Sequence, residues 1–200
     1  MKYSQNDEQD YITTILQNTK GRLLDIGAYD GITFSNSYQL LLNGWKGILI
    51  EPAPSVINHL LKNTTDIKDN IEIVNAAITP NSSSELLKFY DANTDAVSTS
   101  DENHKKIWEK NINYRKVYVP TITIQDIFRT FGTNFEFINI DVEGQNPNIL
   151  ETIPLNETNT KVICIEHQHE FDRITNYVSK FGFKKVHMNG ENIIFEKQYD

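Results

Sequence analysis

The sequence predicts an α/β protein built around a mostly parallel β-sheet that ends in an antiparallel hairpin. Three observations carry this prediction: continuous apolar runs of strand length, helical patterns between them, and an Asn-Gly pair near the end of the chain. Apolar runs without strict alternation are typical of strands that helices cover on both faces. Strands that alternate with helices along the chain indicate a sandwich with the sheet in the middle.

Segments with the length and composition of strands recur along the whole chain. The first five are continuous apolar runs and are expected to be parallel, whereas the last two flank Asn189-Gly190, the strongest short signal for a hairpin. The expected strands cover residues 22–26, 47–52, 71–76, 135–141, 161–167, 183–188 and 192–197.

Helical patterns lie between these segments, and local signals mark several of their ends. Asn43-Gly44 and Gly182 are typical of residues that end helices, and Pro54-Ser55 is typical of a helix start. The expected helices cover residues 4–17, 35–44, 54–63, a segment beginning at 123, 148–152 and 171–181.

One segment does not fit the alternation of strands and helices. Residues 91–119 are polar, have weak periodicity, and carry the isolated aromatic residues Trp108 and Tyr114. A long irregular insert between core elements is usually functional or mobile. We therefore expect a single domain over residues 1–200, with a lid-like insert at about 91–119 that covers the substrate side.

Composition restricts the class of protein and its surroundings. The chain has 200 residues and a net charge of -8, which argues against a general nucleic-acid surface and against binding to anionic membranes. It has one cysteine, Cys164, so it forms no intramolecular disulfide. The polar, acidic N-terminus does not resemble a signal peptide, and no apolar run is long enough to span a membrane. These features favour a cytoplasmic location.

A glycine-containing turn follows the first expected strand, in the stretch Asp25-Ile-Gly-Ala-Tyr-Asp-Gly31. A turn of this kind at the carboxyl edge of an open α/β sheet is a common ligand-binding position, and Gly27 allows a ligand to approach the backbone. Glu51 closes the second strand, where an acid can accept two hydrogen bonds from a ribose diol. Each feature alone could be an ordinary turn or a solvated strand end, but together they favour a nucleoside-binding site.

At this point the sequence resembles the FkbM-type S-adenosylmethionine-dependent methyltransferases. The resemblance implies a Rossmann-like class I methyltransferase sandwich of seven strands, with the last strand antiparallel beside the fifth. It also implies transfer of a methyl group to a hydroxyl of a sugar, glycan or small metabolite. The motifs that carry it are SQNDEQ (4–9), LLDIGAYDG (23–31), TFSNSY (33–38), GWKGILIEPAP (44–54), NAAIT (75–79) and FINIDVEGQNPNIL (137–150).

The resemblance also assigns expected roles to individual residues in binding S-adenosyl-L-methionine. Glu51 matches the ribose-binding acid, and Gln145 departs from the family, which often has Glu at this position. Ser4 and Gln5 belong to an N-terminal pattern expected to fold over the cofactor, although Ser4 could simply cap a helix. The expected cofactor loop comprises Asp25, Gly27, Ala28, Asp30 and Gly31, and the expected adenine region Asn75, Ala76 and Ala77.

Ligand-type residues end the fourth and fifth strands, where the methyl acceptor is expected. Asp141, Glu166 and His167 match the layout of some metal-dependent O-methyltransferases and could hold Mg²⁺ or Mn²⁺. Alternatively, His167 is a general base that Glu166 orients, without a metal. A third interpretation is a strand end without chemistry. Glu143 either faces the substrate or caps a short helix.

Histidines outside this group are expected to be structural or exposed, namely His59, His104, His169 and His187. A non-catalytic interaction module that retains the methyltransferase fold remains an alternative function. A NAD-dependent reductase is disfavoured because no tyrosine is followed four residues later by lysine. An RNA ribose methyltransferase is disfavoured by the acidic composition. The acceptor and the oligomeric state stay open.

Overall fold

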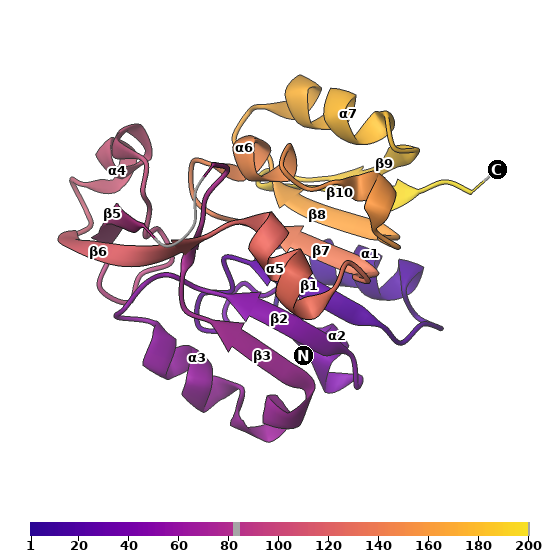
Figure 1. Ribbon diagram of the computed structural model, residues 1–200, viewed down its shortest axis with the longest axis horizontal. Coiled ribbons are helices and arrows are strands. Elements are labelled where there is room, and N and C mark those ends of the chain that lie inside the picture. Colours follow the sequence, from indigo (N-terminus) through magenta and orange to yellow (C-terminus); the bar gives the residue numbers. More distant parts are fainter. Residues whose placement is uncertain (82–84, 200) are drawn as a thin grey trace.

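The computed structural model describes residues 1–81 and 85–199. Their elements form three layers, with helices on both faces of a central twisted sheet, and a smaller sheet with its own helix projects beyond one edge (Figure 1). Within the described part of the chain, no helix combines the length and the hydropathy that crossing a membrane requires.

The central sheet has seven strands in the order β3-β2-β1-β7-β8-β10-β9. The first five of these are parallel, and β10 runs antiparallel to both of its neighbours. This confirms the predicted parallel core, the terminal hairpin, and the last strand beside the fifth. The strands are β1 (Arg22–Ile26), β2 (Lys46–Ile50), β3 (Ile71–Val74), β7 (Phe137–Ile140), β8 (Val162–Glu166), β9 (Phe183–Met188) and β10 (Asn192–Lys197).

Six helices cover the two faces of this sheet because alternate strand residues point to opposite sides. Ile138 and Ile163 pack toward one face, and Phe137 and Cys164 pack toward the other. The first face is covered by α5 (Ile124–Phe131), α6 (Asn146–Leu150) and α7 (Phe171–Ser179). The second is covered by α1 (Glu8–Ile15), α2 (Tyr38–Leu42) and α3 (Ile57–Asn63). Short 3₁₀ turns lie at Thr65–Asn70 and Leu155–Glu157.

The N-terminal helix begins later than the sequence predicted. Ser4 forms an isolated bridge with Phe34, so the first residues run beside the loop after β1. Helix α1 then starts at Glu8, and its N-cap residue Asp7 makes no capping hydrogen bond with its side chain. The Ser4 hydroxyl instead accepts a hydrogen bond from the Gln9 amide at 3.2 Å.

The insert is more regular than the sequence predicted. Residues 91–119 run from the end of β5 (Leu86–Asp91) through α4 (Glu102–Trp108) into β6 (Arg115–Ile122). Strand β6 pairs antiparallel with β5 and parallel with β4 (Ala77–Ile78). Helix α4 has no buried residue, so it carries no apolar periodicity that could reveal it. Pro120 interrupts the strand signal of β6, because proline has no amide hydrogen to donate to a neighbouring strand.

The insert lies beyond the carboxyl ends of the parallel strands, as Figure 1 shows for β2, β7 and β8. Ligands of open α/β sheets bind at this edge, outside the carboxyl ends of the strands. The fold therefore places the turns after β1, β2, β7 and β8 beneath the insert.

Candidate active site

A cavity of about 430 Å³ lies between the carboxyl edge of the central sheet and the insert. Its walls combine the loop after β1, the end of β2, the segment before β4, the turn after β7 and the insert. The residues that line it include Gln5, Asp25, Gly27, Ala28, Phe34, Glu51, Ala76, Ala77, Ser98, His104, Trp108, Asp141, Glu143, Gln145, Glu166, Glu191 and Asn192.

Gly27 forms the floor of the cavity where β1 meets the end of β7. Its φ is +91°, and a Cβ atom added there would lie 1.7 Å from the Asp141 carbonyl oxygen. The amides of Gly27 and Ala28 both donate to the Ile50 carbonyl at 3.0 Å. Glycine is therefore required by the close approach of neighbouring protein backbone, and not only by room for a ligand, as the sequence had indicated.

Asp30 and Gly31, which were expected in the cofactor loop, are not among the residues that line the cavity. Asp30 accepts hydrogen bonds from the Ile32 amide at 2.9 Å and the Thr33 amide at 2.7 Å. Gly31 has a φ of +82°, and a Cβ atom there would lie 2.7 Å from the Leu60 side chain. Both residues shape the loop after β1 and let it pack against α3, so their role is to support the loop.

Asp25 is buried at the end of β1 and lines the cavity. It accepts hydrogen bonds from the Ser37 hydroxyl and from the Asn139 side-chain amide. Burial raises the pKa of the Asp25 carboxyl above its ordinary value, although both hydrogen bonds oppose this. Asp25 therefore ties the first strand to β7 and to the segment before α2.

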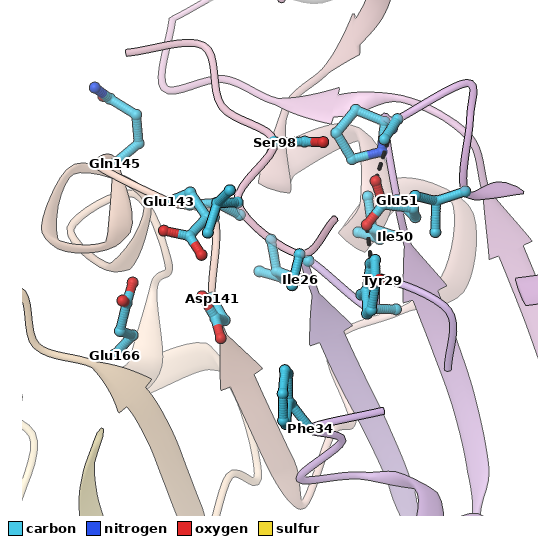
Figure 2. Close-up of a pocket in the computed structure, with 18 of the residues that line it drawn as sticks. Ile26, Tyr29, Phe34, Ile50, Glu51, Ser98, Asp141, Glu143, Gln145 and Glu166 are labelled. Carbon is cyan, nitrogen blue, oxygen red and sulfur yellow. Dashed lines mark hydrogen bonds between the residues drawn. The ribbon is translucent and has the colours of Figure 1, made fainter. Parts of the chain in front are cut away.

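Glu51 lies one residue beyond β2, where the sequence placed the ribose-binding acid. Its two carboxylate oxygens accept from the Tyr29 amide at 2.9 Å and the Ala53 amide at 2.7 Å (Figure 2). Burial raises the pKa of Glu51 to about 7. A carboxylate oxygen has two lone pairs, so each oxygen retains acceptor capacity after its backbone bond.

Only part of the expected adenine region lines the cavity. Ala76 and Ala77 line the cavity and are almost fully buried. Asn75 does not line it, because its side-chain amide donates to the Glu51 carbonyl at 2.7 Å. Asn75 therefore holds the chain after β3 against the end of β2 and leaves the two small alanines to form the wall. At the N-terminus, Gln5 lines the cavity and the buried Ser4 does not.

Three carboxylates gather at the opposite end of the cavity from Glu51 (Figure 2). Asp141, Glu143 and Glu166 each present an oxygen, and these oxygens lie within 4.8 Å of one another. We call these three residues the acid cluster. Burial and the charge of Glu166 raise the pKa of Asp141 well above its ordinary value. Burial and the charge of Glu143 raise the pKa of Glu166 to about 7.

The members of the acid cluster differ in their partners. Glu166 accepts hydrogen bonds from the side-chain amides of Asn146 and Gln168, both at 2.7 Å. One oxygen of Asp141, Oδ1, is inaccessible to solvent and has no hydrogen-bond partner. A buried acceptor without a hydrogen-bond donor is energetically costly. A ligand that donates a hydrogen bond to Asp141 Oδ1 would remove this cost.

His167 does not join the acid cluster, contrary to the expected ligand set of Asp141, Glu166 and His167. Its side chain is 3% exposed and packs against Phe171 with a ring-centroid distance of 4.3 Å. Its Nε2 lies 3.2 Å from the Asn189 carbonyl oxygen, and its Nδ1 accepts from the His169 amide. The ring thus joins β8 to the hairpin turn, and Glu143 takes the third position near Asp141.

His104, which the sequence analysis expected to be structural or exposed, lines the cavity. It comes from α4, lines the cavity, and places its Nε2 at 2.7 Å from the Glu143 carboxylate. Burial alone would lower the pKa of His104, but the neighbouring Glu143 and the charge of Glu166 raise it above its ordinary value. The sequence did contain one indication that His104 faces the cavity. His104 and Trp108 lie four residues apart, which places them on one face of a helix.

The turn after β7 is also the place where the core contacts the insert. Gly144 has a φ of +100°, and a Cβ atom there would lie 2.9 Å from the Asp101 side chain. The Gln145 side chain donates to Asp101 at 3.2 Å, and the Thr99 hydroxyl donates to the Glu143 carbonyl at 2.6 Å. The amide of Gln145 suits this contact, because a Glu in its place would repel Asp101.

The fold and the cavity at the carboxyl edge define a class I methyltransferase, the class that uses S-adenosylmethionine. Residues 25–185 match the family model described as the methyltransferase FkbM domain. Because that match covers most of the chain, the protein belongs to the FkbM methyltransferase family. No curated protein matched the chain in sequence.

Solved structures share the fold at low sequence identity. The putative methyltransferase yhhF from Escherichia coli has a TM-score of 0.54 and 12% identity, with 100% of this chain and 90% of that chain covered. The METTL16 methyltransferase domain has a TM-score of 0.55 and 13% identity, with 96% and 66% covered. A putative RNA methyltransferase, PH1948 from Pyrococcus horikoshii, has a TM-score of 0.50 and 13% identity, with 96% and 82% covered. These likenesses concern the fold alone.

Proposed function

We propose that this protein transfers the methyl group of S-adenosylmethionine to a hydroxyl oxygen of a sugar, glycan or small metabolite. The observation that carries the proposal is a single cavity with Glu51 and two alanines at one end and the acid cluster at the other. The first end suits a nucleoside, and the second offers carboxylates to a group that loses a proton during transfer.

The residues at the first end fit the cofactor. Glu51 is held by two backbone amides and retains acceptor capacity for the ribose hydroxyls. Ala76 and Ala77 leave room beside it for a flat base. Gly27 and Ala28 present backbone rather than long side chains to the cavity. S-adenosylmethionine, when bound, supplies a methyl group that is already activated by the sulfonium.

The remaining chemistry is orientation of the acceptor and removal of its proton. A general base is most effective when its pKa lies near the working pH. Burial and Glu143 raise the pKa of Glu166 to about 7, and Asn146 and Gln168 fix its orientation. We assign Glu166 as the proton acceptor. His167, which the sequence offered as a general base or a metal ligand, does not line the cavity.

The sequence offered a divalent cation held by Asp141, Glu166 and His167 as one alternative, and the acid cluster has Glu143 in place of His167. All three ligands would then be carboxylate oxygens, a donor set that suits Mg²⁺ or Mn²⁺. Such an ion would supply charge that stabilises the deprotonated hydroxyl.

Two measurements test the proposal in order. Titration calorimetry with S-adenosylhomocysteine should give one site per chain, and a protein that binds neither this product nor S-adenosylmethionine would contradict the proposal. Release of S-adenosylhomocysteine is then followed with a panel of hydroxyl compounds. Cofactor binding without turnover on any of them would favour the alternative, an interaction module that retains the fold.

A further inference from the structure

Resting on the proposed function, we propose that the methyl acceptor carries an ammonium group beside the reacting hydroxyl, as an amino sugar or another amino alcohol does. The proposed ammonium group is inferred from an acidic cavity wall that has unpaired acceptor oxygens and lies next to exposed aromatic rings. An ammonium offers three hydrogen-bond donors and a positive charge, which suit the carboxylate and amide oxygens of this wall.

The charged side chains that line the cavity are predominantly acidic. Of the described residues that line it, none is Lys or Arg, whereas Asp141, Glu143, Glu166 and Glu191 lie at the acceptor end. His104 also lines the cavity and contacts Glu143 from the insert. Carboxylates this close repel one another unless a proton or a cation lies between them. Repulsion therefore disfavours a phosphorylated or otherwise anionic acceptor.

Unpaired acceptors point to a ligand with several donors. Asn192 lines the cavity and is 4% exposed, and its side-chain oxygen Oδ1 accepts no hydrogen bond. Its nitrogen is already committed, since it donates to Glu8 at 2.9 Å. Asp141 Oδ1 is a second buried oxygen without a donor. Asn192 pairs with Glu166 across strands β10 and β8, so it lies beside a member of the acid cluster.

Two aromatic residues make an organic cation a better fit than a bare metal ion. Phe34 and Trp108 line the cavity, and they are 52% and 40% exposed. Aromatic faces attract ammonium groups and pack against sugar rings, whereas a hydrated divalent ion gains little from them. The Glu166 oxygen Oε2 already accepts two amide hydrogens, which reduces its capacity as a close metal ligand.

The ammonium also determines which atom is methylated. A protonated amine has no free electron pair, so it cannot attack the sulfonium. Transfer then breaks the bond from sulfur to the methyl carbon and forms a bond from the hydroxyl oxygen to that carbon. The hydroxyl proton passes to Glu166, and the ammonium keeps its protons. An amine held by carboxylates therefore favours O-methylation over N-methylation.

The test uses the full chain saturated with S-adenosylhomocysteine, so that loss of cofactor binding is detected first and separately. Calorimetry at pH 7.5 compares glucosamine, 2-aminoethanol and a series of longer amino alcohols with their N-acetyl forms, with glucose and glucuronate, and with MgCl₂ or MnCl₂. We expect at least one amine to bind ten-fold or more tightly than its N-acetyl form, and its affinity to fall as salt rises.

Two variants then test whether the amine binds at the acidic end of the cavity. Glu191→Gln and Glu143→Gln should each weaken amine binding several-fold without changing the affinity for S-adenosylhomocysteine. Glu72→Gln is the matched control, since Glu72 is an exposed carboxylate on β3 outside the cavity. Equal affinity for amines and their N-acetyl forms, absence of binding by every amine, or preferred binding of glucuronate or of Mg²⁺ would each overturn the proposal.

Discussion

The Nε2 atom of His104 lies 2.7 Å from a carboxylate oxygen of Glu143, and this contact joins the insert to the turn after β7. The two side chains are mostly buried, with 12% and 17% exposed. Exposed ion pairs are worth little, but pairs shielded from solvent are screened less. The contact therefore ties the position of α4 to the residues that form the acceptor end of the cavity.

Replacing Asp101 by Ala should loosen α4. The Asp101 side chain caps this helix by accepting from the amides of Asn103 and His104. Loss of an N-cap costs about 1 kcal/mol, which corresponds to roughly five-fold faster hydrogen exchange in the helix. Lys106→Ala, at an exposed position of the same helix, is the control. Exchange that is equal in both variants would show that the cap does not hold α4.

His104→Ala should loosen the contact between α4 and the turn after β7 without changing the fold of the central sheet. Hydrogen exchange over residues 91–119 should quicken, whereas exchange in β1 and β7 stays as in the wild type. A lid should also respond to ligands, so exchange in this segment should slow when S-adenosylhomocysteine binds. An insert whose exchange is insensitive to both changes is not a lid.

Glu51→Ala should weaken the binding of S-adenosylmethionine by roughly 1.5–3 kcal/mol, because a hydrogen bond to a charged group is worth about that much. The variant also leaves the Tyr29 and Ala53 amides without their acceptor, so its thermal stability must be recorded alongside calorimetry. Unchanged affinity in a folded variant would mean that Glu51 does not bind the ribose.

Glu51 should make stability depend on pH. Its pKa rises from 4.5 to about 7 on folding because burial penalises the charged form. A raised acid pKa means that the folded state binds the proton more tightly, so stability falls as pH rises from 4.5 through 7. Relative to wild type, Glu51→Gln should therefore gain up to about 3 kcal/mol between pH 5 and pH 8. Urea unfolding at the two values checks this, and a constant difference would contradict it.

Gly27→Ala should be far more disruptive than Gly44→Ala. Both glycines have a positive φ, which costs an L-residue about 1–2 kcal/mol. Only at Gly27 would the new Cβ meet backbone, 1.7 Å from the Asp141 carbonyl, whereas at Gly44 the nearest atom lies at 3.8 Å. Overpacking should add roughly 1–3 kcal/mol at Gly27. Similar unfolding free energies for the two variants would contradict this placement of the loop.

A chelator should leave turnover unchanged if the acceptor itself supplies the positive charge. Once an acceptor is identified, the rate is measured with EDTA and then with added Mg²⁺ or Mn²⁺. Loss of activity with EDTA and recovery with either ion would instead support a metal in the acid cluster. Asp141→Asn should then also weaken the binding of that ion.

The sequence by itself determined the central sheet and the positions of the loop after β1 and of Glu51. The parallel strands of that sheet are short apolar runs, and the loop after β1 and Glu51 follow their strands directly, so periodicity and local order were sufficient to place them. The Asn189-Gly190 turn likewise fixed the hairpin, because its conformation depends on neighbouring residues only. Such features follow from contacts within a few residues along the chain.

Only the tertiary structure decided which side chains meet at the acceptor end. His167 follows β8 directly, but packing against Phe171 turns its ring away from the cavity. His104 lies far along the chain from Glu143, on a helix without apolar periodicity, and no local pattern could bring the two together. The direction of a side chain at a strand end and the docking of an exposed helix depend on long-range packing, which the one-dimensional pattern does not contain.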